Sequence, residues 1–145
     1  MRFMIIVKAT PETEAEDGLQ APDQALMKAM ADYHEQLIQA GVLLDGSGLK
    51  ASRHGWRISF ADTGGQADER RIVDGPFAET KELIAGYTLI QVRSRDEALE
   101  WARRYPNPVG QGRAAELEVR ELYELDDFAP SEQLDRMRNM PVLGQ

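Results

Sequence analysis

The sequence predicts an α+β fold of the ferredoxin-like, split βαβ kind, in which helices cover one face of an antiparallel sheet. Three observations predict it. A run of β-branched and aromatic hydrophobics covers residues 2–8, helical periodicity follows over residues 22–40, and a capping box at Ser94 and Glu97 starts a second helix. Segments with strand character lie between the helices and after the second one. The order is therefore strand, helix, two to three strands, helix, strand.

Length and charge limit the class of protein. The 145 residues fit one compact domain, and 17 Lys and Arg against 25 Asp and Glu give a net charge of -8. An acidic surface repels phosphate backbones and anionic lipid, so nucleic-acid and membrane-surface binding are disfavoured. The chain has no cysteine, and its longest apolar run, residues 3–7, is far shorter than the ~20 residues of a membrane helix. We expect a soluble cytoplasmic protein.

The first strand and the first helix have the clearest patterns. Both faces of the 2–8 strand are apolar, which is typical of a central strand. Residues 9–20 are acidic and aperiodic, so we expect a solvated loop there. In the following helix the apolar positions recur at steps of four, three and four, and Gly41 ends it; these positions are Leu26, Met30, Tyr33 and Leu37.

The middle of the chain predicts shorter strands. Residues 45–48, Asp-Gly-Ser-Gly, indicate a turn or bulge that interrupts a strand. Trp56, Ile58 and Phe60 alternate with polar residues, which is the pattern of a half-buried strand, and residues 70–73 are expected to pair with it. A further strand is predicted over residues 86–93.

After the second helix, which prolines and glycines end at residues 106–112, residues 115–125 alternate well enough for a last strand. We therefore expect one domain over residues 1–125 and a tail over residues 126–145. The tail carries a short helix around Leu134 and Met137 and is expected to latch onto a partner subunit. Because both faces of the first strand are apolar, an isolated monomer would expose an apolar sheet, and we expect a homodimer joined sheet to sheet.

Residues 73–87, Val-Asp-Gly-Pro-Phe-Ala-Glu-Thr-Lys-Glu-Leu-Ile-Ala-Gly-Tyr, resemble the signature of the DGPF-domain branch of the YCII-related proteins. Residues 41–50 and 96–102 are similar to the corresponding stretches of these proteins. The resemblance implies a dimeric α+β barrel with a pocket between helix and sheet, and it implies no activity. Some relatives are encoded beside extracytoplasmic-function sigma factors, which implies a regulatory context for some members.

The wider YCII-related group has a proposed pair of a histidine, one turn before a tyrosine on the first helix, and an aspartate before a proline after the second. In this sequence Met30 stands at the first position, ahead of Tyr33, and Tyr105 at the second, ahead of Pro106. Neither member of the pair is present, so catalysis by that pair does not carry over to this chain.

Two residues are the candidates for acid or base catalysis. Asp74 opens the signature, where its carboxylate either accepts the Phe77 amide in a structural Asx turn or faces a ligand at the mouth of a pocket. His34 adjoins the apolar stripe of the first helix, where it is either a satisfied boundary residue or a proton carrier oriented by Asp45 or Asp74. The ligand-binding candidates are Asp45, Tyr33, Phe77, Thr80 and Lys81. Asp45 also fits a turn, and Phe77 also fits a core position.

Metal and cofactor sites are not indicated. The two histidines, twenty residues apart, have no metal-ligand spacing, and a haem would have only His34 as an axial ligand. Two hypotheses follow. In the first, the chain holds a small molecule in a pocket and performs proton transfer or hydrolysis with Asp74 and the help of His34. In the second, it is a non-catalytic regulatory or interaction module, linked to an extracytoplasmic-function sigma factor, whose acidic surface meets a protein partner.

Overall fold

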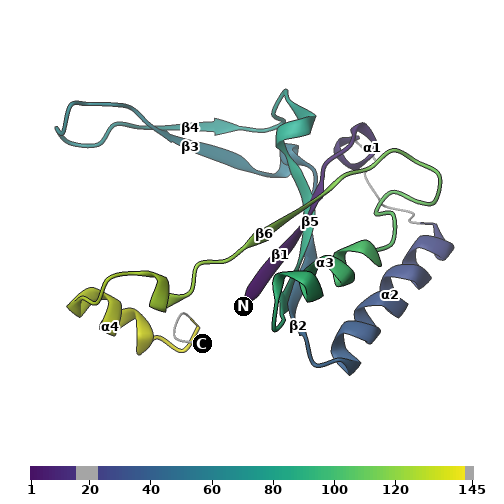
Figure 1. Ribbon diagram of the computed structural model, residues 1–145. Coiled ribbons are helices and arrows are strands. Elements are labelled where there is room, and N and C mark those ends of the chain that lie inside the picture. The colour runs from purple at the N-terminus through teal and green to yellow at the C-terminus, as the bar shows by residue number, and fades with distance from the viewer. Residues whose placement is uncertain (16–22, 143–145) are drawn as a thin grey trace.

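The computed structural model describes residues 1–15 and 23–142. A four-stranded antiparallel sheet forms its centre, built from β1 (Arg2–Lys8), β2 (Leu43–Gly48), β5 (Ile84–Gln91) and β6 (Leu117–Glu121) in the order β2-β5-β1-β6. Strand β1 pairs on one side with β5 and on the other with β6, which confirms it as a central strand. The architecture is the predicted ferredoxin-like α+β fold (Figure 1).

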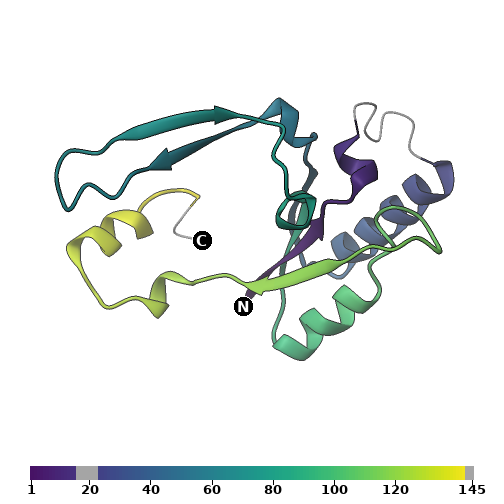
Figure 2. The same ribbon diagram turned by 90° about the horizontal axis from the view of Figure 1, so that it is seen from above.

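Two helices, α2 (Gln24–Gln39) and α3 (Arg95–Arg103), lie on one side of this sheet (Figures 1 and 2). Asp23 caps α2 by accepting the Ala25 amide, and Ser94 caps α3 by accepting the Glu97 amide. The core between helices and sheet is made of residues buried on the predicted faces: Phe3, Ile5, Tyr33, Leu37, Val42, Ile90, Val92, Ala98 and Trp101. The amphipathic patterns of both helices are thereby confirmed.

The acidic segment after β1 departs from the predicted loop. Residues 11–14 form a single helical turn, α1 (Pro11–Glu14), because Thr10 accepts the Thr13 amide while the Thr13 hydroxyl accepts the Thr10 amide. Both threonines of this capping box are buried. Residues 16–20 of the predicted loop lie outside the described residues.

Strand β2 corrects the prediction of a turn at Asp-Gly-Ser-Gly. All four residues belong to the strand and pair with β5, and the irregularity of the ladder falls between Leu43 and Asp45. The bulge was therefore predicted correctly in kind, but the glycines are strand residues rather than turn residues.

Strands β3 (Trp56–Phe60) and β4 (Arg70–Asp74) pair with each other as predicted, but they form a separate two-stranded sheet. This hairpin extends from the domain on the side away from α2 and α3 (Figures 1 and 2). The prediction of a half-buried strand was wrong for this chain alone, since Trp56 is 64% exposed and Phe60 is 60% exposed. The alternating pattern indicates one apolar face without indicating what covers it.

The base of the hairpin is fastened to the short helix η1 (Ser52–His54). The Phe77 amide donates to Ser52 Oγ at 3.0 Å, and the Gly75 amide donates to the Gly55 carbonyl at 2.9 Å. The Phe77 amide therefore bonds Ser52 rather than the Asp74 carboxylate of the expected Asx turn. Ser52 in turn donates to the Glu14 carboxylate of α1, from its hydroxyl at 2.6 Å and its amide at 3.0 Å. We call these contacts the Ser52 clasp.

The remaining elements are the short helices η2 (Thr80–Glu82) and η3 (Leu125–Asp127) and the helix α4 (Glu132–Arg138). Helix α4 confirms the short helix predicted in the tail, and Leu134 is its buried residue. The tail extends from the same side of the sheet as the hairpin (Figure 1). None of the helices in the described part of the chain is long and apolar enough to cross a membrane.

Candidate functional site

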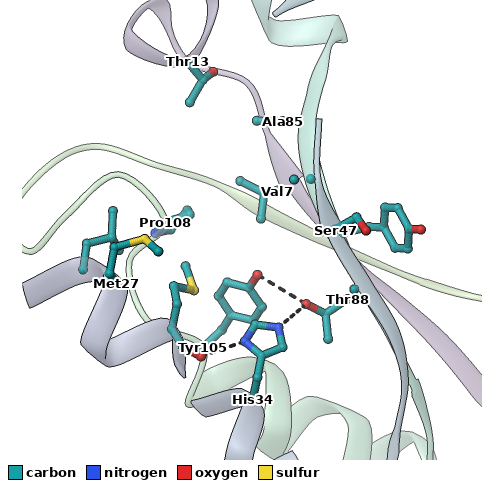
Figure 3. Close-up of a pocket in the computed structure, with 15 residues that line it drawn as sticks. Val7, Thr13, Met27, His34, Ser47, Ala85, Thr88, Tyr105 and Pro108 are labelled. Carbon is teal, nitrogen blue, oxygen red and sulfur yellow. Dashed lines mark hydrogen bonds between the residues drawn. The ribbon is translucent and has the colours of Figure 1, made fainter. Parts of the chain in front are cut away.

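A cavity of about 520 Å³ lies between α2 and the β2-β5 part of the sheet. Cavities of this size are typical of small-molecule sites. Its lining is mostly apolar: Val7, Thr13, Leu26, Met27, Met30, His34, Gly46, Ser47, Gly48, Ala85, Gly86, Tyr87, Thr88, Tyr105 and Pro108. Figure 3 shows the side chains of His34, Thr88 and Tyr105 converging at one end of it.

The cavity exists because its floor has almost no side chains. Gly46 stands opposite Thr88, and Gly48 opposite Gly86, in the β2-β5 ladder. Directly opposite residues of an antiparallel pair share a face of the sheet, so three glycines and one threonine occupy the face below α2. Gly86 is also required by close approach, since a Cβ there would lie 2.9 Å from the Ser47 carbonyl oxygen. The missing side chains leave a hollow that α2 spans.

The imidazole of His34 is held by both ring nitrogens. Nδ1 lies 2.8 Å from the Met30 carbonyl oxygen, one turn earlier on α2, and Nε2 lies 3.0 Å from Thr88 Oγ1. A carbonyl oxygen only accepts hydrogen bonds, so Nδ1 carries the proton in the neutral ring and Nε2 accepts from the Thr88 hydroxyl. The fold therefore fixes both the orientation and the tautomer of this histidine. The Tyr105 hydroxyl lies 3.4 Å from Thr88 Oγ1 and extends the chain.

Aromatic rings of α2 and of the segment after α3 pack against the His34 ring. The Tyr33 ring meets His34 edge-on at 5.5 Å between centroids and Tyr105 at 5.0 Å. The Tyr33 hydroxyl donates to the Trp101 carbonyl at 2.7 Å, which ties α2 to α3. Burial raises the pKa of both Tyr33 and Tyr105, so these hydroxyls remain protonated donors well above neutral pH.

Because folding raises the pKa of Tyr33 and Tyr105, we expect the free energy of unfolding to fall at alkaline pH. A tyrosine whose pKa is raised by folding contributes stability that is complete below the unfolded value near pH 10 and is lost as the pH rises above it. Each such tyrosine costs about 1.4 kcal/mol at pH 11 if it stays neutral in the folded state. We expect Tyr33→Phe to lose less stability than the wild type between pH 9 and 11, measured by urea unfolding. Equal losses in the two proteins would contradict this account.

The YCII-related domain model matches residues 1–123 of the chain. The chain belongs to the YCII-related family. An uncharacterized protein of Rhizobium meliloti (strain 1021) is 34% identical to this YCII-related chain over 85 residues, which are 59% of the chain. The chain matches 64% of the length of that relative.

Of the predicted site residues, His34 lines the cavity of this YCII-related protein, but its ring is oriented by Met30 and Thr88. The expectation that Asp45 or Asp74 orients it was therefore wrong. Tyr33 is buried behind the cavity and is 3% exposed. Asp45 is exposed on β2, where its carboxylate accepts from the Tyr87 hydroxyl at 2.8 Å. That hydrogen bond raises the pKa of Tyr87.

The signature residues lie elsewhere. Asp74 is exposed at the end of β4, opposite Trp56, and lies outside the lining of the cavity. Phe77 is half-buried beside a second cavity of about 350 Å³ at the base of the hairpin, with the Arg57 guanidinium 3.9 Å from its ring centroid. Thr80 and Lys81 belong to η2, outside both linings. The roles of Asp74, Phe77, Thr80 and Lys81 in catalysis or binding stay predictions.

Several residues that line the cavity were not singled out as site residues from sequence. Thr88 and the floor glycines carry no local signal, because threonine suits a strand and the glycines fit a turn equally well. Met30 and Tyr105 were noted as replacements of the family's proposed pair but not as site residues, and both line the cavity. Among residues 1–15 and 23–142, no group of three or more His, Asp or Glu is arranged to hold a metal ion.

Proposed function

We propose that this YCII-related protein binds a small molecule in the cavity under α2 and that His34 exchanges a proton with it through the Thr88 hydroxyl. The observation that carries the proposal is the contact of Nε2 with Thr88 Oγ1 at 3.0 Å at the polar end of a mostly apolar cavity. Imidazole is the side chain that ordinarily changes charge near neutral pH, and a fixed tautomer suits it to act as a base.

The proton path follows from the hydrogen bonds. When Thr88 passes its proton to Nε2, its oxygen takes a proton from a bound acid, so the acid becomes an anion and the imidazole becomes a cation. The Met30 carbonyl, 2.8 Å from Nδ1, stabilises the cation because it accepts the hydrogen bond from the Nδ1–H group. The reverse transfer protonates a bound base.

The histidine ring is the direct way to test this proposal. The chain has two histidines, so a long-range 1H–15N spectrum shows two rings, and His54 serves as the internal control because it is exposed at the second cavity. We expect His34 in the Nδ1–H tautomer and expect its signals to move when members of a fragment collection are added. Movement of the His54 signals alone would contradict the proposal, as would an Nε2–H tautomer for His34.

Turnover measurements on variants of His34 and Asp74 distinguish which of the two residues is the base. With any fragment that is turned over, we expect His34→Gln to retain binding and lose turnover, because glutamine bonds Thr88 but accepts no proton. Asp74→Asn is the matched variant, since it changes an exposed carboxylate outside the cavity lining. The hypothesis from sequence, in which Asp74 is the base and His34 helps it, predicts instead that Asp74→Asn loses turnover.

We also propose that the protein is a homodimer. Ile58 and Ile72 face each other across the hairpin, and Ile72 is 67% exposed. Met4, Ile6 and Leu89, on the sheet face away from the core, are only partly buried. Both surfaces are apolar and belong to the same chain, so a two-fold arrangement that joins the open sheet faces covers both at once. A non-catalytic module would instead offer the hairpin to a different protein.

Light scattering during size exclusion tests the dimer. We expect a mass about twice 16.3 kDa for the wild type and a shift toward monomer for Ile58→Glu. Ser59→Glu is the matched control, because it adds the same charge to the opposite face of β3. A monomeric wild type would refute the homodimer and favour the module that binds another protein.

A further inference from the structure

We propose that the cavity selects an uncharged, largely apolar molecule that donates a hydrogen bond from an N–H or O–H group. This inference rests on the proposed function, because it names the class of ligand for the same cavity. It is carried by two observations, the absence of Asp, Glu, Lys and Arg from the described residues of the lining and the direction of the hydrogen-bond chain at its polar end.

The described residues of the cavity lining disfavour an ionised ligand. None of the described residues that line the cavity is Asp, Glu, Lys or Arg. Met27 and Met30 of α2 and Pro108 supply apolar walls, and Figure 3 shows Met27 and Pro108 on the side of the cavity away from Thr88. An ionised ligand loses its hydration on entering such a site, and the neutral form of the His34 ring offers it no charge in return. Methionine side chains adapt their shape to apolar surfaces, so the walls accept a neutral molecule.

The polar end presents acceptors. In the neutral ring, Nδ1 donates to the Met30 carbonyl and Nε2 accepts the single hydroxyl proton of Thr88. In the 3.4 Å contact between Thr88 and Tyr105, the donor is then Tyr105. All hydrogens of the chain are used, and the free positions are lone pairs on Thr88 Oγ1 and the Tyr105 hydroxyl. A ligand that meets this end must bring the hydrogen itself.

Gly46 keeps the space beside these lone pairs open. A Cβ at this position would lie 3.6 Å from His34 Nε2 and 3.7 Å from Thr88 Oγ1, which is ordinary contact without a clash. Alanine therefore fits the strand and fills the place next to the polar end.

Three fluorescent probes with one aromatic skeleton test the inference. N-phenyl-1-naphthylamine is neutral and has an N–H donor, its N-methyl derivative lacks the donor, and 8-anilino-1-naphthalenesulfonate adds an anion. We expect the N-methyl derivative to bind about tenfold more weakly than the parent, the difference of one hydrogen bond worth ~1.4 kcal/mol. We expect the sulfonate to bind more weakly still.

Two variants locate the binding. Gly46→Ala should weaken binding of the parent probe about tenfold or more and abolish the difference between the parent and its N-methyl derivative. Gly55→Ala is the control, because it adds the same methyl group outside the lining of this cavity, at an ordinary 3.6 Å from the Ser52 carbonyl oxygen. Circular dichroism shows whether both variants fold.

The outcomes separate the two proposals. Equal binding of the parent and N-methyl probes, still weakened by Gly46→Ala, would overturn the donor requirement and leave the small-molecule cavity standing. Preference for the sulfonate would overturn the selection of neutral ligands. If Gly46→Ala leaves the affinity of every probe unchanged, both the inference and the proposal that this cavity binds a small molecule are overturned.

Discussion

Replacing Leu37 with alanine is expected to lower the free energy of unfolding by about 3 kcal/mol, the middle of the range for large-to-small changes at fully buried positions. Leu37 has no exposed surface and lies at the centre of the core between α2 and the sheet. Truncation removes its apolar burial and leaves a hole that the surrounding strands fill only in part. In thermal unfolding this corresponds to a fall in Tm of roughly 10 °C for a chain of this size.

The neighbouring residue provides the control. Ile38 is on the same helix and is 62% exposed. Ile38→Ala removes a side chain of similar size from an exposed position. It should change the free energy of unfolding by no more than about 0.5 kcal/mol. Alanine is the better helix former, so a loss at Ile38 equal to that at Leu37 would show that the outer face of α2 is covered in solution.

Replacing Gly75 with alanine is expected to detach the base of the hairpin. A Cβ at Gly75 would lie 1.9 Å from the Ser52 carbonyl oxygen and 2.6 Å from its carbonyl carbon, and both are backbone atoms that have no flexible end to move aside. Overpacking typically costs about 1–3 kcal/mol, and a backbone clash belongs at the upper end. The Ser52 clasp then opens, and the hairpin loses its fixed position on the domain.

Limited trypsin digestion measures this detachment, because Arg57, Arg70 and Arg71 lie in the two hairpin strands. We expect cleavage of Gly75→Ala at these sites at least ten times faster than in the wild type. Gly55→Ala is the matched control in the same clasp, since its Cβ would meet the Ser52 carbonyl oxygen at an ordinary 3.6 Å and its backbone is extended. Equal cleavage of both variants would mean that the close approach at Gly75 does not hold the hairpin.

The elements predicted well are those whose pattern directly records burial. The apolar steps of α2 identify this helix and the face it buries, and the continuous apolar run of β1 identifies a central strand. The burial of the hairpin formed by β3 and β4 could not be predicted in this way. Trp56 and Phe60 alternate as a strand should, yet their exposure depends on what lies opposite, which no local pattern contains.

The candidate site was predicted only in part for the same reason. His34 was found because it adjoins the apolar stripe of its own helix. Thr88 and Gly46 lie 42 residues apart and become one site only when β2 pairs with β5. The signature around Asp74 drew attention to the hairpin base, where Gly75 and Phe77 hold the Ser52 clasp, because a long motif shows that a segment is constrained without showing which interaction constrains it.

The central position of β1 also has a consequence for how the chain folds. Phe3 pairs with Ile90 on one side and with Glu121 on the other, so the two partners of this β1 residue lie 87 and 118 residues later in the chain. Closing loops of this length before any contact stabilises them slows folding, and sheets dominated by such distant pairings fold over milliseconds to seconds. Until these pairs form, β1 lacks the strands that flank it in the sheet, and its apolar residues are open to association with other chains.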